Sequence, residues 1–237
     1  MGEIISFVGQ KGGTGKSTLA RAFAVEAAKA GKNLLIADLD EPQRTSWEWG
    51  QRRAANAFLP PIAVEALPRL QVFSRAASLD MLIADAPGWA DASTVWLAQG
   101  SQLTVLPTGS SVDDLNPTIR LTHELINKGI ADWRLAVALC RIQTDAEAEF
   151  ARSYLKQAGY TALKGLLREK KGYRDMQNEG HAITESPIAS LAHEAFDLIG
   201  SIAAALDRTQ KKERALDRQT KGPARLVRSK DKDRGDR

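Results

Sequence analysis

Residues 4–18 read IISFVGQKGGTGKST and contain the pattern that decides the fold. The apolar residues that open this stretch are typical of a buried parallel strand. After it, Leu19, Phe23 and Ala27 recur at the spacing of one helical face. The glycines in between allow a tight turn whose backbone N–H groups point inward, at the positive end of the helix dipole. The stretch therefore predicts a phosphate-binding loop between a strand and a helix over residues 17–30.

The polar residues of this loop have the spacing that binds a triphosphate and its metal ion. Lys16 would reach the β- and γ-phosphates, and the Ser17 hydroxyl would bind Mg²⁺. Gln10 stands where the ordinary motif has its first glycine, and a second lysine, Lys11, precedes the glycine pair. The residues that we expect to contact the nucleotide here are Gly12, Gly13, Thr14, Gly15, Lys16, Ser17 and Thr18.

In this form, K-G-G-x-x-K-S, the loop resembles the deviant Walker A motif of the ParA/MinD family of ATPases. The resemblance covers residues 1–206 and implies an α/β fold, a single-domain P-loop NTPase with a mostly parallel sheet and helices on both faces. It also implies that the protein binds ATP and Mg²⁺ and hydrolyses ATP weakly on its own. In the family the first lysine reaches across a nucleotide-sandwich dimer. Lys11 is therefore expected to contact a partner subunit's phosphates, and Lys11, Lys16 and Asp40 to be the catalytic residues.

Two further apolar runs end in carboxylates, at Asp38 and at Asp85. In a parallel sheet these strand ends would lie beside the phosphate-binding loop. By the resemblance, Asp40 positions the attacking water and Asp38 supports the metal shell. Asp85 fits a Walker B strand and would hold Mg²⁺ through a water, and the Pro87-Gly88 turn after it would lie against the γ-phosphate. Without the phosphate-binding loop, Asp38 and Asp40 would be interpreted as turn or helix-capping residues.

One insertion departs from the family's D-x-D-P-Q segment. Here Glu41 stands between Asp40 and the Pro42-Gln43 pair. We therefore expect Asp40 to keep its distance from the strand, while Gln43 does not keep the position of the family's glutamine.

The sequence favours ATP over GTP as the bound nucleotide. Residues 127–130 read NKGI, which lacks the aspartate of the guanine-reading N-K-x-D sequence. Arg141 follows a predicted strand over residues 135–139 and, by the resemblance, lies near the adenine. Cys140 is the only cysteine, which excludes an intramolecular disulfide and the cysteine pairs of iron–sulfur relatives.

Composition and charge divide the chain unequally. With 237 residues, 43% hydrophobic and 26% charged, it fits one α/β domain over residues 1–206. The net charge is +4, and residues 207–237 hold twelve Lys/Arg against six Asp/Glu. These last residues are poor in apolar side chains, so we predict a basic, disordered tail. We expect a cytoplasmic protein, because no apolar run approaches the roughly 20 residues needed to cross a bilayer and the N-terminus lacks a basic segment followed by a signal core. We also expect no membrane contact, because the tail lacks the apolar face of a MinD-type membrane helix.

Further basic residues and the family resemblance suggest the partners. In the family such residues grip DNA nonspecifically, and the alternative is a solvated charged face. The predicted DNA-binding residues are Arg152, Lys156, Lys164, Arg168, Lys170, Lys171 and Arg174. The resemblance thus implies an ATP-dependent homodimer, associated with the nucleoid, that partitions DNA together with a ParB-type centromere-binding adaptor. The alternatives are positioning of another cargo, an ATP-dependent metabolic ligase and a nucleotide-gated scaffold without turnover.

Overall fold

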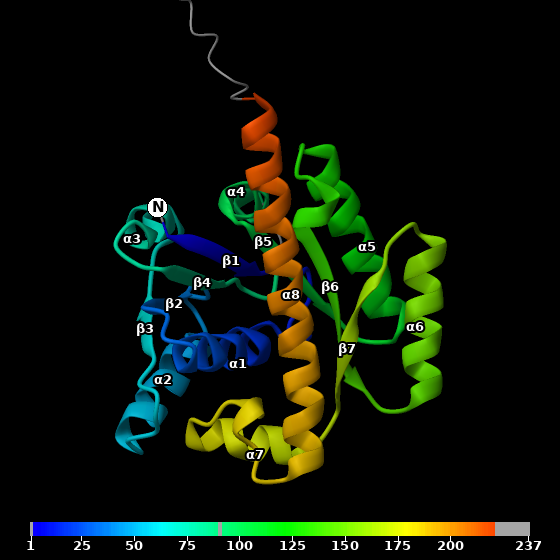
Figure 1. Cartoon of the computed structure of the whole chain (residues 1–237). Coiled ribbons are helices and arrows are strands. Elements are labelled where there is room, and N and C mark those ends of the chain that lie inside the picture. The colour runs from blue at the N-terminus through cyan, green and yellow to red at the C-terminus, as the bar shows by residue number, and fades with distance from the viewer. Residues whose placement is uncertain (1, 90–91, 221–237) are drawn as a thin grey trace, which may run out of the picture.

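Seven parallel strands form one sheet in the order β3-β2-β4-β1-β5-β6-β7 (Figure 1). The structure is a computed structural model, which describes residues 2–89 and 92–220. The strands are β1 (Glu3–Phe7), β2 (Leu34–Asp38), β3 (Ala63–Ala66), β4 (Met81–Asp85), β5 (Leu103–Thr108), β6 (Leu135–Ile142) and β7 (Ala162–Arg168). Because β1 lies between β4 and β5, the chain reverses its direction of strand addition at β1, where α/β sheets bind their ligands.

Helices cover both faces of this sheet, as the sequence predicts. They are α1 (Lys16–Lys29), α2 (Thr45–Ala55), α3 (Val72–Ala76), α4 (Ala92–Gly100), α5 (Val112–Asn127), α6 (Asp145–Gln157), α7 (Lys171–Glu179) and α8 (Ala189–Thr220). Short 3₁₀ turns are η1 (Arg69–Gln71), η2 (Asp132–Arg134) and η3 (Ile183–Glu185). Buried residues of α1 and α8 share one core cluster, and those of α3, α4 and α5 share another. The predicted P-loop NTPase architecture is confirmed.

The central strand shows why the sequence forms this layered core. Ile5 and Phe7 of β1 belong to the cluster under α1 and α8, whereas Ile4 and Val8 belong to the cluster on the opposite face. All four side chains are fully buried. A strand covered on both faces needs apolar residues without alternation, and that is the pattern of the first strand in the sequence.

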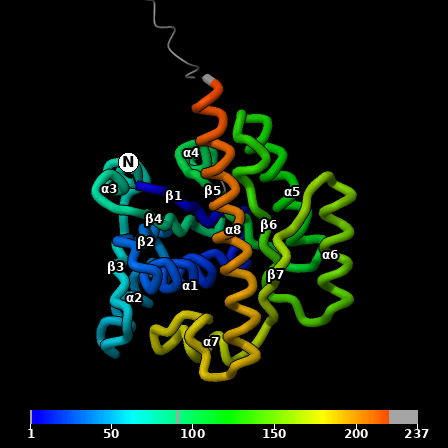
Figure 2. Tube along the Cα trace, in the orientation of Figure 1, coloured from blue at the N-terminus to red at the C-terminus, as the bar shows by residue number. Residues whose placement is uncertain are grey.

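The longest helix, α8, crosses the sheet face beside β7 and continues beyond it (Figures 1 and 2). A segment of α8 has a mean hydropathy of 1.2, long and apolar enough for a membrane span by composition alone. Leu198 and Ile202 of this helix are nevertheless fully buried in the protein core. About a third of this segment, 33%, is buried inside the protein, so core packing accounts for part of the apolar character of α8.

The prediction of a disordered tail is wrong for residues 207–220, because α8 continues through them. Polar contacts attach this part of the helix to the body, among them an ion pair between Arg134 and Glu213 at 3.9 Å. The Thr209 hydroxyl donates to the Trp133 carbonyl at 3.0 Å, and Gln210 donates to the Glu3 carboxylate at 2.7 Å. A helix already nucleated by packing adds further turns at low cost. The rest of the predicted tail, residues 221–237, lies outside the described residues.

Candidate nucleotide-binding site

The predicted phosphate-binding loop joins β1 to α1, and its glycines adopt backbone angles that favour glycine. Gly13 and Gly15 have φ of 74° and 108°. A Cβ on Gly15 would also lie 3.1 Å from the Cys140 sulfur, so β6 closes one side of the loop. Lys16 is buried, and its ammonium donates to the Lys11 carbonyl at 2.9 Å. Burial lowers the pKa of Lys16, against the attraction of Asp85 and Asp40, so the loop places one cation close to both acids.

Asp85, at the end of β4, has the properties expected of a residue that holds a metal ion. Its Oδ2 accepts a 2.6 Å hydrogen bond from the Ser46 hydroxyl, whereas Oδ1 is buried and has no hydrogen-bond partner in the described part of the chain. Burial raises the pKa of the Asp85 carboxyl to about 6, against the hydrogen bond from Ser46 and the charge of Arg21. An unsatisfied carboxylate oxygen beside the Ser17 hydroxyl fits Mg²⁺, which often binds through one or two protein groups and the nucleotide phosphates.

The carboxylate of Asp38, at the end of β2, makes different contacts from that of Asp85. Its two carboxylate oxygens accept three backbone N–H groups, from Asp40 at 3.1 Å, Ser46 at 2.8 Å and Trp47 at 2.9 Å. Most of its lone pairs are therefore occupied by the turn into α2. A direct metal contact by Asp38 stays a prediction. Its observed contacts fix the loop that carries Asp40. Within residues 2–89 and 92–220, no group of three or more His, Cys, Asp or Glu side chains forms a metal site by itself.

The loop after β2 absorbs the inserted residue Glu41. The Asp40 carbonyl accepts from the N–H groups of Gln43 at 3.1 Å and Arg44 at 2.8 Å, which closes a turn over Glu41 and Pro42. Arg44 then takes a left-handed conformation with φ of 47°. The turn confines the insertion to exposed positions, so Asp40 stays next to β2 while Gln43 lies at the surface.

The second lysine of the loop points away from Lys16. The Lys11 ammonium pairs with the Asp114 carboxylate of α5 at 2.6 Å, and about half of the Lys11 side chain is exposed, 49%. Burial would raise the pKa of Asp114, but hydrogen bonds from Lys11 and Ser111 outweigh it and lower that pKa. Lys11 therefore lies on the rim of the site, where a second molecule can reach it.

The loop after β4 lies directly against the phosphate-binding loop. A Cβ built on Gly88 would lie 3.0 Å from the Gly12 Cα, so a larger residue would have to push the phosphate-binding loop back by a few tenths of an ångström. Pro87 precedes it at the end of the Walker B strand. The contact of Pro87 and Gly88 with the phosphates stays a prediction.

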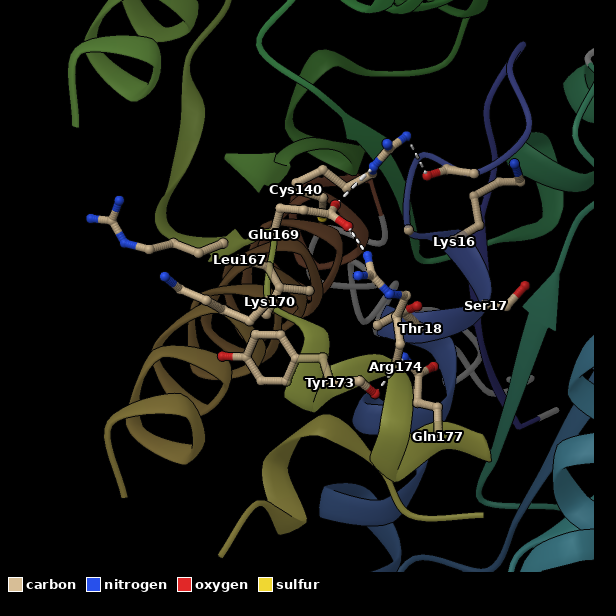
Figure 3. A pocket seen from close by; sticks show the side chains of 14 residues that line it. Lys16, Ser17, Thr18, Cys140, Leu167, Glu169, Lys170, Tyr173, Arg174 and Gln177 are labelled. Atoms are coloured by element: carbon tan, nitrogen blue, oxygen red, sulfur yellow. Dashed lines mark hydrogen bonds and ion pairs between the residues drawn. The ribbon is translucent and has the colours of Figure 1, made fainter. Parts of the chain in front are cut away.

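A cavity of about 370 Å³ opens between the phosphate-binding loop and the segment that joins β7 to α7 (Figure 3). Lys16, Ser17 and Thr18 line one side, and Tyr173 and Gln177 of α7 line the other.

Arg141 lies at the edge of this cavity. Its guanidinium donates to the Gly13 carbonyl at 3.3 Å and pairs with Glu169 at 3.0 Å. Its φ of 58° is unusual for a residue with a side chain and turns it toward the loop. The cavity thus extends from the predicted phosphate site to the predicted adenine side.

A family profile covers all of these elements. The profile described as the CobQ/CobB/MinD/ParA nucleotide binding domain matches residues 5–226. The chain belongs to this family. The membership inferred from K-G-G-x-x-K-S is therefore confirmed. A search of curated protein sequences found no match.

Solved structures that share the fold of this chain differ widely from it in sequence. Apo McdA from Cyanothece has a TM-score of 0.67 at 14% identity, covering 87% of this chain and 100% of that chain. A putative plasmid partition protein from Borrelia burgdorferi bound to AMPPNP has a TM-score of 0.67 at 14% identity, covering 86% and 99%. MinD from Pyrococcus horikoshii complexed with Mg-ADP has a TM-score of 0.62 at 18% identity, covering 85% and 96%. These identities establish the likeness of fold alone.

The seven basic residues predicted to bind DNA do not form one free surface in this family member. Four of them are paired within the protein: Arg152 with the Leu163 carbonyl, Arg168 with Asp145 and Glu194, Lys171 with Asp175, and Arg174 with Glu169. Arg168, Lys170 and Arg174 line the cavity beside the phosphate-binding loop. Lys164 lies near the start of β7, roughly 20 Å from Lys170 at the rise of a strand, and Lys156 is exposed on α6. These basic residues therefore do not share one free surface, and DNA binding by them stays a prediction.

Two polar residues of the site escaped the sequence analysis. Ser46 and Arg21 are both buried, and they contact each other at 3.0 Å behind the Walker B carboxylate. Arg21 carries a signal that a closer reading would find, since it is a charged residue among apolar neighbours, four positions after Ser17 on the same helix face. For Ser46 the sequence carries no such signal, because its contacts come from three separate elements.

Proposed function

We propose that this protein is an ATPase of the partition type, in which ATP closes two copies of the chain face to face. The observation that carries the proposal is the pair of lysines in one loop. Lys16 is buried and serves its own site, whereas Lys11 lies half exposed on the rim. A cation on the rim adds nothing to a closed single-chain site, but it can bind phosphates held by a second copy.

The residues of the site then have distinct tasks in hydrolysis. Lys16 and the loop N–H groups bind the β- and γ-phosphates and stabilise the charge that develops there. Asp40, held next to β2 by the turn over Glu41, positions the attacking water. Mg²⁺, bound by Ser17 and Asp85, would neutralise phosphate charge when the nucleotide is present. Gly88, packed against the loop, would sense loss of the γ-phosphate.

Two substitutions test the chemistry. Lys16→Ala removes the buried cation and should abolish ATP binding, measured by titration with a fluorescent ATP analogue. Asp40→Ala should retain ATP binding and dimerisation but lose turnover at least about 100-fold, as removal of a group that orients the nucleophile does. Full turnover in Asp40→Ala would refute the assignment of Asp40.

We also propose that the dimer holds DNA nonspecifically, at a groove distant from the nucleotide site. A cavity of about 670 Å³ lies between the starts of β6 and β7 and the C-terminal half of α8. Three cations line it, Lys164, Arg208 and Lys212, and no acidic side chain does. The Lys212 ammonium lies 5.6 Å from the centre of the Trp133 ring, which forms part of the wall. This charge pattern suits a phosphate backbone.

Dimerisation would strengthen DNA binding at this groove by presenting two copies of it on one molecule. Reversing two charges, Lys164→Glu with Arg208→Glu, should weaken binding to a random duplex and reduce the slope of log K against log salt by roughly 2. Lys156→Glu, on the exposed face of α6, is the matched control. Equal losses in both variants would contradict the assignment of the groove.

A ParB-type adaptor and a nucleoid location complete the proposed function. A pulldown with ATP and the Asp40→Ala protein should recover a DNA-binding adaptor if the protein partitions DNA. Recovery of a different cargo protein would favour the positioning of other cargo. An ATPase rate that DNA does not change, in a protein that stays monomeric with ATP, would favour a metabolic ligase.

A further inference from the structure

A buried arginine lies directly behind the predicted metal site. Arg21 of α1 is only 7% exposed, although arginine is seldom buried without a carboxylate partner. It follows Ser17 by four residues, so both side chains lie on one face of α1. Burial lowers the pKa of Arg21 to about 10, against the attraction of Asp85 and Asp38. The protein thus places a desolvated cation next to the two carboxylates that end β2 and β4.

Ser46 connects this cation to both carboxylates. Its hydroxyl accepts from the Arg21 Nε at 3.0 Å and donates to the Asp85 Oδ2 at 2.6 Å. Its backbone N–H donates to the Asp38 Oδ2 at 2.8 Å. Ser46 has no solvent exposure, so water cannot replace any of these bonds. One hydroxyl, with a single proton to donate, is therefore directed at Asp85 because Arg21 occupies its acceptor side.

A second buried arginine, Arg53, shows that this arrangement differs from a structural ion pair. Arg53 is 1% exposed and binds the Glu185 carboxylate through two nitrogens, at 2.7 and 2.9 Å. The hydrogen bonds of Arg21 instead go to Ser46 and to Gln177. An arginine buried only for stability would be expected to have such a direct fork with a carboxylate. One hydrogen bond of Arg21 therefore orients Ser46, where Arg53 binds a carboxylate directly.

The second contact of Arg21 leads to the other side of the nucleotide cavity. Its Nη1 donates to the Gln177 side chain at 3.3 Å. Gln177 belongs to α7 and lines the cavity opposite the phosphate-binding loop (Figure 3). A chain of hydrogen bonds therefore runs from α7 through Arg21 and Ser46 to Asp85.

We propose that Ser46 and Arg21 are positioning residues that hold Asp85 and Asp38 in place for the Mg²⁺ that arrives with the nucleotide. Ser46 leaves the Asp85 Oδ1 unpaired for the metal by occupying Oδ2, and Arg21 fixes the direction of the Ser46 hydroxyl. Gln177 makes this arrangement sensitive to the position of α7. The inference rests on the proposed ATP site.

The test compares ATP affinity in Mg²⁺ with ATP affinity in EDTA, using a fluorescent, non-hydrolysable analogue. Ser46→Ala should reduce the gain in affinity that Mg²⁺ gives by at least about tenfold, the usual effect of removing a group that orients a metal ligand. Its affinity in EDTA should stay that of the wild type. Ser101→Ala is the matched control. Ser101 is equally buried, and its hydroxyl donates to the Leu97 carbonyl at 2.8 Å, away from the site.

Two further variants keep the result interpretable if Ser46→Ala fails to fold. Ser46→Thr retains the hydroxyl and should recover most of the Mg²⁺-dependent gain. Arg21→Gln removes the cation and should lower the same gain, and combining it with Ser46→Ala should add little, because both act through one hydrogen-bond chain. Equal gains in Ser46→Ala, Arg21→Gln and the wild type would overturn the inference. A wild-type protein that binds no ATP would overturn the proposed function itself.

Discussion

The contact between Lys11 and Asp114 offers the most direct test of the dimer hypothesis. Their 2.6 Å ion pair holds Lys11 within its own chain, yet the Lys11 side chain is 49% exposed. Exposed ion pairs contribute about 1 kcal/mol or less, so the bond is easily exchanged for a contact with a partner's phosphates. The cis contact is therefore compatible with a cross-subunit function.

Lys11→Ala should accordingly lose ATP-dependent dimerisation while it keeps nucleotide binding, because Lys16 is untouched. Light scattering with ATP in an Asp40→Ala background measures the first property, and analogue titration the second. Asp114→Asn is the control. It removes only the weak cis pair and should change the dimer dissociation constant by no more than about fivefold. A Lys11→Ala protein that still dimerises would exclude the cross-subunit contact.

Single residues also show what the sequence can predict. Lys16, Ser17 and the glycines act through positions adjacent in the chain, so their spacing was enough to place them. Arg21 and Ser46 act through contacts between α1, α2 and β4, which no local pattern records. Residue spacing likewise does not show that Asp145 and Glu194, more than 20 positions away, pair with Arg168.

Among the elements, α8 depends on one close approach to β7. A Cβ on Gly165 would lie 2.5 Å from the Leu198 Cα and 2.6 Å from its N, so any side chain would push the helix away. Gly165→Ala should therefore lower the free energy of unfolding by about 3 kcal/mol, the upper part of the range for overpacking. Urea denaturation measures it.

Gly200 of the same helix provides the matched substitution. Nothing lies within 4 Å of a Cβ at that position. Gly200→Ala should stabilise the protein by about 1 kcal/mol through helix propensity alone. If both alanines had the same effect, the packing of α8 on β7 would not depend on the absence of a side chain at Gly165.

Composition did not predict how far the helix α8 extends. A count of charged residues after position 206 favours disorder, yet polar contacts from Thr209, Gln210 and Glu213 hold that part of the helix on the body. Composition measures how much apolar surface a segment can bury, and it does not record hydrogen bonds to distant elements.

For the whole molecule, the class of fold followed from the order of motifs, since a strand, a phosphate-binding loop and later strands ending in acids occur in sequence. The strand order did not follow in the same way. It requires knowing that β1 lies between β4 and β5, and that the segment after α7 returns to pack against α2. Both depend on contacts between residues more than 75 positions apart.

The ion pair between Arg53 and Glu185 joins α2 to the segment that follows α7. Arg53 of α2 is buried, and besides the carboxylate it donates to the Gly180 carbonyl at 3.1 Å. Burial would raise the pKa of Glu185, but hydrogen bonds from Arg53 and the Ala182 N–H outweigh it and lower that pKa. Removing the charge of Glu185 would leave a buried guanidinium unpaired, which costs about 3–5 kcal/mol.

Glu185→Gln should therefore lower the free energy of unfolding by about 3–5 kcal/mol at pH 7. Because the folded pKa of Glu185 is lowered, its contribution is complete above the usual glutamate pKa of about 4.3. It is lost as the pH falls through the folded value. The gap in stability between the wild type and Glu185→Gln should then narrow as the pH falls below about 4. Urea denaturation from pH 7 to pH 3 measures this gap, and a constant gap over that range would show that the charge of Glu185 is not what holds Arg53.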